Sequence, residues 1–128
     1  MREILRSDKL PGPKFKYSPC VKVGPIYQMA GMIGLDRETG SLVTGGPAAE
    51  TAKILNNLER ALPDFNLTWD NLFQATVFTT RFDEFPLING AWEHTFNDNN
   101  PPPARTAVGV SALPLGASVE IEFRFYKE

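Results

Sequence analysis

The sequence predicts an α+β fold of one domain, in which helices cover one face of a mainly antiparallel sheet. Three observations carry this prediction. The chain has 128 residues, the usual size of a single domain. Its 11 prolines and 10 glycines divide it into short segments. These segments change between strand and helix periodicity in the order β-β-β-α-β-α-β-β, with no linker between them, so we treat 1–128 as one domain.

The first three expected strands lie near the N-terminus. Residues 15–23 and 26–34 are rich in β-forming side chains, and Gly24-Pro25 between them is typical of a turn. A second turn over 36–40 leads to a short third strand over 42–44. The sheet should therefore begin with three consecutive strands.

The first expected helix begins at Pro47, where the missing N–H of proline is harmless, and ends before Pro63. Its apolar residues recur at spacings of three or four: Ala48, Ala52, Leu55, Leu58 and Leu62. This spacing predicts an amphipathic helix with one buried face.

A strand and a second helix should follow. Residues 72–80 are rich in threonine, valine and phenylalanine, which favour a strand. Asp83 is a suitable cap for the second helix. The inner stripe of this helix is formed by Phe85, Ile88, Trp92 and Phe96. We interpret the stripe as core packing.

The last two strands, over 105–111 and 117–126, are expected to pair as an antiparallel hairpin. The second alternates sharply: Val119, Ile121, Phe123 and Phe125 share one face, and Glu120, Glu122, Arg124 and Tyr126 share the other. In the first strand, Thr106 and Val108 should lie with the apolar set. Pairing Ala107 with Glu120 would then bring Arg105 within about 7 Å of Glu120.

This hairpin would give one sheet face a guanidinium, a carboxylate and two small residues, Ala107 and Gly109. Arginine binds carboxylates through a planar fork, and a nearby glutamate can polarise water or move a proton. The alternative reading of the spacing is an ordinary solvated ion pair. The same face also predicts oligomerisation, because it would expose small and apolar residues to water: Phe73, Val77, Ala107 and Gly109. An exposed apolar patch of this kind favours contact with another subunit.

The composition excludes several classes of protein. Thirteen lysines and arginines against 15 aspartates and glutamates give a net charge of −2, so we expect no nucleic-acid partner. One cysteine and one histidine exclude a disulfide framework and a zinc finger. We interpret Cys20 as a buried structural residue and His94 as a surface or packing residue. Charges interrupt the N-terminal residues 1–8, so we expect a cytoplasmic protein with no membrane segment.

The C-terminal third carries a specific resemblance. Pro102-Pro103-Ala104-Arg105-Thr106-Ala107-Val108-Gly109-Val110, then Leu113-Pro114 and Val119-Glu120-Ile121-Glu122, resembles the signature of the reactive-intermediate deaminase family, RidA, formerly YjgF. The turn Ala30-Gly31-Met32-Ile33-Gly34-Leu35-Asp36 with Thr39-Gly40, and the segment 85–96, are similar to further parts of that family. The similarity runs from about Tyr17 to Phe125.

The resemblance implies a fold, an activity and a site. The fold is the chorismate-mutase-like α+β trimer with inter-subunit sites. The activity is hydrolysis of reactive enamines and imines, such as 2-aminoacrylate, to 2-oxo acids and ammonia, without a cofactor or metal. Arg105 would bind the carboxylate of the small substrate, and Glu120 would activate or orient water. The other implied site residues are Tyr17, Ala30, Gly31, Asn89 and Ala107.

Two site positions depart from the family's common pattern. Ala30 stands where a serine is frequent, and Ala107 where a cysteine is frequent. The pocket is then less polar and slightly larger, so a bulkier or unsaturated substrate is as plausible as 2-aminoacrylate. The alternative function is a non-catalytic trimer that binds a 2-oxo acid or related metabolite as a regulator or chaperone-like protein. The presence of both Arg105 and Glu120 favours the enzyme, because a protein that only binds a carboxylate needs the arginine and has no evident need of the glutamate.

Overall fold

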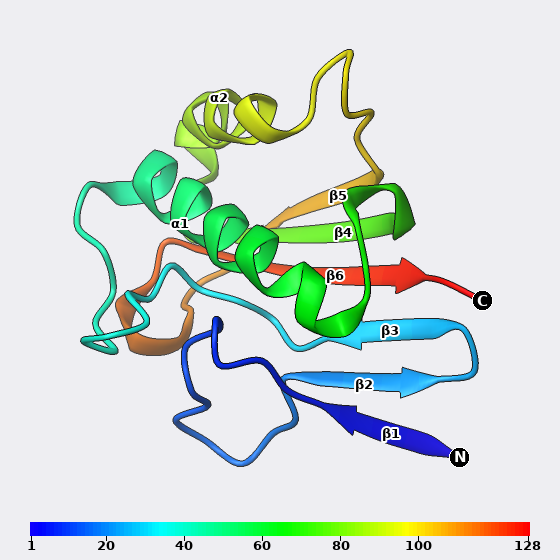
Figure 1. Ribbon diagram of the computed structural model, residues 1–128. Coiled ribbons are helices and arrows are strands. Elements are labelled where there is room, and N and C mark those ends of the chain that lie inside the picture. Colours follow the sequence, from blue (N-terminus) through cyan, green and yellow to red (C-terminus); the bar gives the residue numbers. More distant parts are fainter.

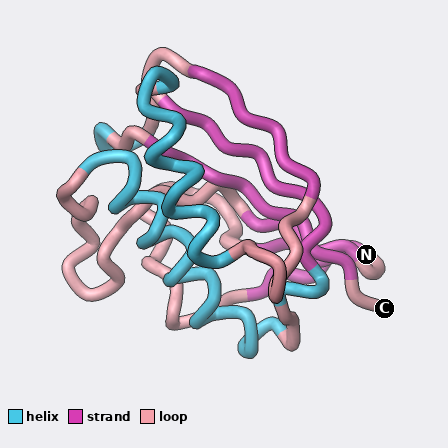
Figure 2. Tube along the Cα trace, turned by 90° about the horizontal axis from the view of Figure 1, so that it is seen from above, coloured by secondary structure: helices cyan, strands magenta, loops and turns pink.

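The computed structural model describes residues 1–128 as a six-stranded sheet with two helices on one of its faces (Figures 1 and 2). The elements are β1 (Arg2–Leu5), β2 (Cys20–Val23), β3 (Ile26–Met29), α1 (Gly46–Ala61), β4 (Leu72–Thr79), α2 (Phe85–Thr95), β5 (Ala104–Gly109) and β6 (Val119–Tyr126). Short 3₁₀ turns lie at Leu62–Phe65, Trp69–Asn71, Phe82–Glu84 and Pro114–Gly116. The α+β class is confirmed. Neither helix is long and apolar enough to cross a membrane.

The N-terminal strands differ from the prediction. Only the last four residues of 15–23 form a strand, β2, and only the first four residues of 26–34 form β3. Within 42–44, Leu42 makes a single bridge, to Leu35. β1 was not expected, because this edge strand has no buried apolar face to give a pattern. The predicted number of strands is therefore right. Two of the first three strands lie within their predicted segments, whereas the expected strand over 42–44 is wrong and β1 takes its place in the count.

The predicted hairpin between the last two strands is wrong. The sheet order is β1-β2-β3-β6-β4-β5, and β5 pairs with β4 in parallel. β6 lies between β3 and β4 and is antiparallel to both, as Figure 1 shows. The physical reason is burial: Phe123 and Phe125 of β6 are fully buried at this central place, whereas half-exposed β5 is suited to an edge.

The register assigns each side chain to a face. Arg105 pairs with Ala75, which pairs with Phe123 on the face covered by the helices. Val108 and Glu120 both pair with Phe78 on the opposite face, which we call the open face. Because neighbours in register share a face, Thr106 and Val108 do not join the apolar set. Val77, Ala107 and Gly109 lie on the face covered by the helices, so they are not part of the open face as expected.

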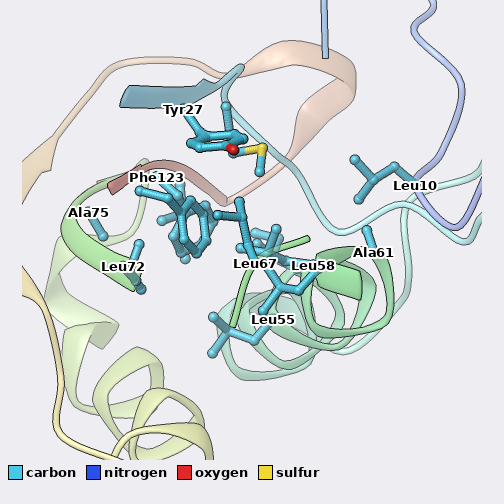
Figure 3. Close-up of a cluster of buried hydrophobic side chains, with 14 of the residues drawn as sticks. Leu10, Tyr27, Leu55, Leu58, Ala61, Leu67, Leu72, Ala75 and Phe123 are labelled. Carbon is cyan, nitrogen blue, oxygen red and sulfur yellow. The ribbon is translucent and has the colours of Figure 1, made fainter. Parts of the chain in front are cut away.

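The core lies between the helices and strands β4 and β6, and Figure 3 shows part of it. The predicted inner stripe of α2 is confirmed, with Ile88, Trp92 and Phe96 buried. Asp83 does not cap α2: it lies in the 3₁₀ turn before the helix, and no side chain caps the helix start.

The buried face of α1 is rotated from the predicted stripe. Leu55, Leu58 and Leu62 are buried as expected, but Ala52 is exposed. Two polar residues, Glu50 and Asn57, are buried instead. Tertiary hydrogen bonds to Ser118 and to the Leu35 carbonyl make their burial possible.

Candidate functional site

The seven predicted site residues form two separate groups in the chain. The first group lines one cavity of about 310 Å³: Tyr17, Ala30, Gly31 and Glu120. The second group lies along β5 and under α2: Asn89, Arg105 and Ala107. The expected proximity of Arg105 and Glu120 within one chain is therefore wrong, because the two side chains leave opposite faces of the sheet.

In the first group, Gly31 packs directly against the Glu120 carboxylate. A Cβ at position 31 would lie 2.9 Å from Glu120 Cδ and closer still to Oε2. Two backbone hydrogen bonds hold this arrangement: Met32 N–H donates to the Ile121 carbonyl at 2.8 Å, and Ile121 N–H donates to the Met32 carbonyl at 2.9 Å. Only glycine leaves room for the carboxylate at this distance.

The surroundings of Glu120 favour its neutral form. Burial, and to a lesser degree the charge of Glu122, raise the pKa of Glu120 above its usual value. Burial and then the negative charge of Glu120 raise the pKa of Tyr17. A carboxyl group with a raised pKa is a better proton acceptor near neutral pH than an exposed one. The first group therefore combines a proton-transfer group with a phenol.

The cavity is lined mostly by apolar surface. Its inner wall includes Leu10, Leu35 and Ile54. Pro114 and Leu115 also line it, and the sequence analysis did not assign them to the site. The Leu113-Pro114 motif was the available signal. The cavity is large compared with a side chain of one methyl group.

In the second group, Arg105 lies between two aromatic rings of α2. Its Cζ is 5.1 Å from the ring centre of Phe85 and 5.0 Å from that of Trp92. Its Nη2 donates a 2.8 Å hydrogen bond to Asn89 Oδ1, and its buried Nη1 has no partner. Burial lowers the pKa of Arg105, which the charge of Glu93 partly offsets. Arginine stays protonated in proteins, so an anion is the natural partner for the guanidinium where it lines a surface pocket with Asn89 and Trp92.

Ala107 lies two residues further along the same face of β5 and is half-buried against the core. Phe85 and Trp92, which we interpreted only as core residues, also orient the guanidinium. The signal for this second role was their spacing from Asn89 on one helix. Cation–π contacts at such distances hold a guanidinium plane in place.

The remaining candidate residues do not form a site. No three histidine, cysteine, aspartate or glutamate side chains gather in a metal-binding cluster. Cys20 is fully buried, as expected, and burial raises the pKa of its thiol to about 11. Its thiol is therefore inert at neutral pH. His94 is exposed on α2.

Comparison with known proteins shows to which family the chain is similar. Residues 8–125 match the family model described as endoribonuclease L-PSP. A RutC family protein of Aquifex aeolicus is 38% identical over 95% of this chain and 96% of its own length. The human 2-iminobutanoate/2-iminopropanoate deaminase is 34% identical over 95% of this chain and 88% of its own length.

A solved structure extends the similarity to the fold. RidA from the Antarctic bacterium Psychrobacter sp. PAMC 21119 superposes with a TM-score of 0.90 and is 30% identical, over 98% of this chain and 99% of the other. The match to the family model spans nearly the whole chain. This chain belongs to the endoribonuclease L-PSP family, the RidA/YjgF family that the C-terminal motif resembles.

Proposed function

We propose that this protein hydrolyses 2-imino acids and their enamine tautomers to 2-oxo acids and ammonia, in sites formed between two copies of the chain. One observation carries the proposal: within one chain, Arg105 and Glu120 lie on opposite faces of the sheet and cannot act on the same small molecule. Arg105 lines a surface pocket together with Asn89 and Trp92, and Glu120 has a raised pKa and lines the cavity of the first group. The names of the mammalian relatives support the substrate class.

The two halves supply complementary parts of the reaction. Arg105 of one copy binds the carboxylate of the iminium substrate. Glu120 of the other copy accepts a proton from water as the water oxygen bonds to C2 and the C=N electron pair moves to nitrogen. The product of this step is a carbinolamine. Glu120 returns the proton to nitrogen, and the C–N bond breaks as a lone pair of the hydroxyl oxygen forms the C=O bond of the 2-oxo acid. The hydroxyl proton passes to Glu120 and then to the departing ammonia, which leaves as ammonium.

The open face supports assembly into a homotrimer. Phe73, Val108 and Tyr126 are exposed large side chains on or beside strands whose helix-facing residues are buried. Exposed apolar residues on an uncovered sheet face favour contact with another subunit. Closed symmetry would repeat the contact and produce identical sites between neighbours.

Two other functions fit the observations less well. A ribonuclease, which the family description names, would bind a polyanion, but this chain has a net charge of −2 and a carboxylate in its cavity. A trimer that only binds a 2-oxo acid would use Arg105 and would have no need of Glu120. The raised pKa of Glu120 favours proton transfer and hence the enzyme.

The test is an assay in which an amino-acid oxidase generates the imine in the reaction mixture and the disappearance of the imine is measured. Purified protein should accelerate imine disappearance, with 2-oxo acid and ammonia released in equal amounts. Arg105→Ala and Glu120→Gln should each lose most of the activity. If wild-type protein binds 2-oxobutanoate in calorimetry but accelerates no imine, the binding function replaces the enzyme.

Mixing the two inactive variants tests the shared site. After unfolding and refolding together in equal amounts, about a quarter of the interfaces combine an intact Arg105 with an intact Glu120. Activity should return to that fraction of wild type. No recovery in correctly assembled mixed oligomers would contradict an inter-subunit site.

A further inference from the structure

Glu50 of α1 is a buried carboxylate without a cation partner. Only 3% of the residue is exposed. Its Oε1 accepts hydrogen bonds from Ser118 N–H at 2.8 Å and Val119 N–H at 3.3 Å, and its Oε2 accepts one from the Ser118 hydroxyl at 2.6 Å. Three donors therefore offset the cost of burying the carboxylate.

These contacts fix the two residues that come directly before Glu120. The Ser118 carbonyl is held from the other side, because Thr79 Oγ1 donates to it at 2.8 Å and Thr80 N–H at 3.1 Å. Ser118 is thus bound both to α1 and to the end of β4. The backbone that carries Glu120 has little freedom to move.

The same turn of α1 also packs against Gly34, in the segment that follows Gly31. A Cβ at Gly34 would lie 2.9 Å from Glu50 Cα, so the segment after Gly31 packs directly on the helix at this residue. Glu50 is therefore where α1 meets both the segment that contains Gly31 and the segment that ends in Glu120. Figure 1 shows the two segments converging near the start of α1.

We infer that Glu50 is a positioning residue for the hydrolysis, acting through Ser118 and Val119 to hold Glu120 against Gly31 at the cavity mouth. The inference rests on the proposed function, because the role of Glu120 does. Glu50 does not touch the cavity. Its effect is on the position of the Glu120 carboxylate, and a displacement of about 1 Å is enough to lower a rate by about 10²-fold.

Three variants and one control test this role. Glu50→Gln keeps all three contacts, because its amide oxygen accepts from the backbone and its amide nitrogen donates to the Ser118 hydroxyl oxygen. Glu50→Leu keeps the volume and removes every contact. Ser118→Ala removes only the hydroxyl contact. Thr51→Val is the control, because Thr51 is equally buried on α1 but bonds only to the Pro47 carbonyl in its own helix.

Steady-state kinetics should separate positioning from general stability. We expect kcat of Glu50→Leu to fall about 30-fold or more with KM changed less than about 3-fold, and kcat of Ser118→Ala to fall about 3-fold to 10-fold. Glu50→Gln and Thr51→Val should stay close to wild type. A fall in Thr51→Val equal to that in Glu50→Leu would overturn the inference, because stability alone would then explain the loss.

A second measurement does not depend on activity. The pKa of the Glu120 carboxyl, followed by ¹³C NMR, should shift toward its ordinary value in Glu50→Leu and Ser118→Ala and stay unchanged in Thr51→Val. If wild type hydrolyses no imine, this titration still tests the positioning while the proposed function fails. If Glu50→Leu does not fold, Ser118→Ala decides: an unchanged Glu120 pKa and an unchanged kcat there would overturn the inference.

Discussion

Arg105 Nη2 donates a 2.8 Å hydrogen bond to Asn89 Oδ1, while the other terminal nitrogen of the same guanidinium is buried without a partner. A buried donor without an acceptor is costly, by about 1–3 kcal/mol. The chain tolerates this cost at a position held by two aromatic rings and an amide. Substitution of Arg105 therefore tests the proposed carboxylate-binding role of this guanidinium.

Arg105→Lys should lose most of the affinity for the substrate carboxylate although it keeps the charge. An ammonium group cannot form the planar fork or stack between Phe85 and Trp92. We expect KM to rise about 10-fold or more, with a cost of about 2–5 kcal/mol for Arg105→Ala. Titration with 2-oxobutanoate measures the same loss without turnover. Wild-type affinity in either variant would remove Arg105 from the site.

Gly31→Ala should abolish activity by displacing the Glu120 carboxylate, because the new Cβ would lie 2.9 Å from Glu120 Cδ. The matched control is Gly90→Ala in α2, where a Cβ meets nothing within 4 Å. That change should leave activity intact and stabilise the protein by about 0.5–1 kcal/mol. Activity assays and thermal unfolding of both variants check the pair. Equal activity in the two would disprove the need for glycine at 31.

Glu120→Gln should lower the rate by about 10²-fold to 10⁴-fold and leave 2-oxobutanoate binding unchanged or tighter. In wild type, the rate should rise with pH through the raised pKa of Glu120, because the ionised form is the base. A pH–rate profile and a calorimetric titration measure the two effects. A variant with the wild-type rate would show that Glu120 is not the base.

The same variant should be more stable than wild type at pH 7. Burial raises the pKa of Glu120 in the folded state, so its protonated form stabilises the fold at acid pH and this contribution is lost as the pH rises through the folded pKa. Glutamine stays neutral at every pH. Thermal unfolding should therefore show a higher Tm for Glu120→Gln at pH 7 and no difference at pH 3.

The cavity volume predicts a preference for longer substrate side chains. A space of about 310 Å³ with Leu10, Leu35 and Ile54 on its inner wall exceeds what 2-iminopropanoate fills. Each buried methylene contributes about 0.8 kcal/mol, or about 4-fold in kcat/KM. The value of kcat/KM should therefore increase along the series of imines from alanine, 2-aminobutanoate, norvaline and norleucine. A flat series would mean that the side chain does not enter the cavity, although hydrolysis itself would stand.

Light scattering after size exclusion should give three times the 14.2 kDa mass of the chain. Val108→Asp, on the open face, should weaken the assembly because it puts a charge among exposed apolar side chains. Leu87→Asp is the control, since Leu87 is exposed on α2. Trimer loss with Val108→Asp alone is the expected result. A wild-type monomer at micromolar concentration would contradict the shared site.

Local patterns in the sequence were enough to predict the α+β class, the approximate span of both helices and the inner stripe of α2. These features depend on residues close together in the chain, where periodicity and turn residues carry the information. Candidate site residues could also be predicted, because Arg105 and Glu120 lie in a recognisable C-terminal motif. Gly31 likewise stands in a recognisable turn.

The strand order could not be obtained in this way. Alternation in β5 and β6 is compatible with a hairpin, yet β6 enters the middle of the sheet because its phenylalanines are buried best between β3 and β4. That choice depends on contacts between distant segments, which no local window contains. As a result, Arg105 and Glu120 lie on opposite faces of the sheet and do not form the pair that the expected hairpin would have made.

The burial of Glu50 was decided in the same way. On a helix considered alone, a glutamate is a solvated residue, and only the arrival of Ser118 and Val119 from the far end of the chain supplies its three donors. The sequence by itself determined which chemical groups this protein has and which local elements carry them. The tertiary structure decided which groups meet, because the free energy of burying a charge or an aromatic ring depends on partners distant in the chain.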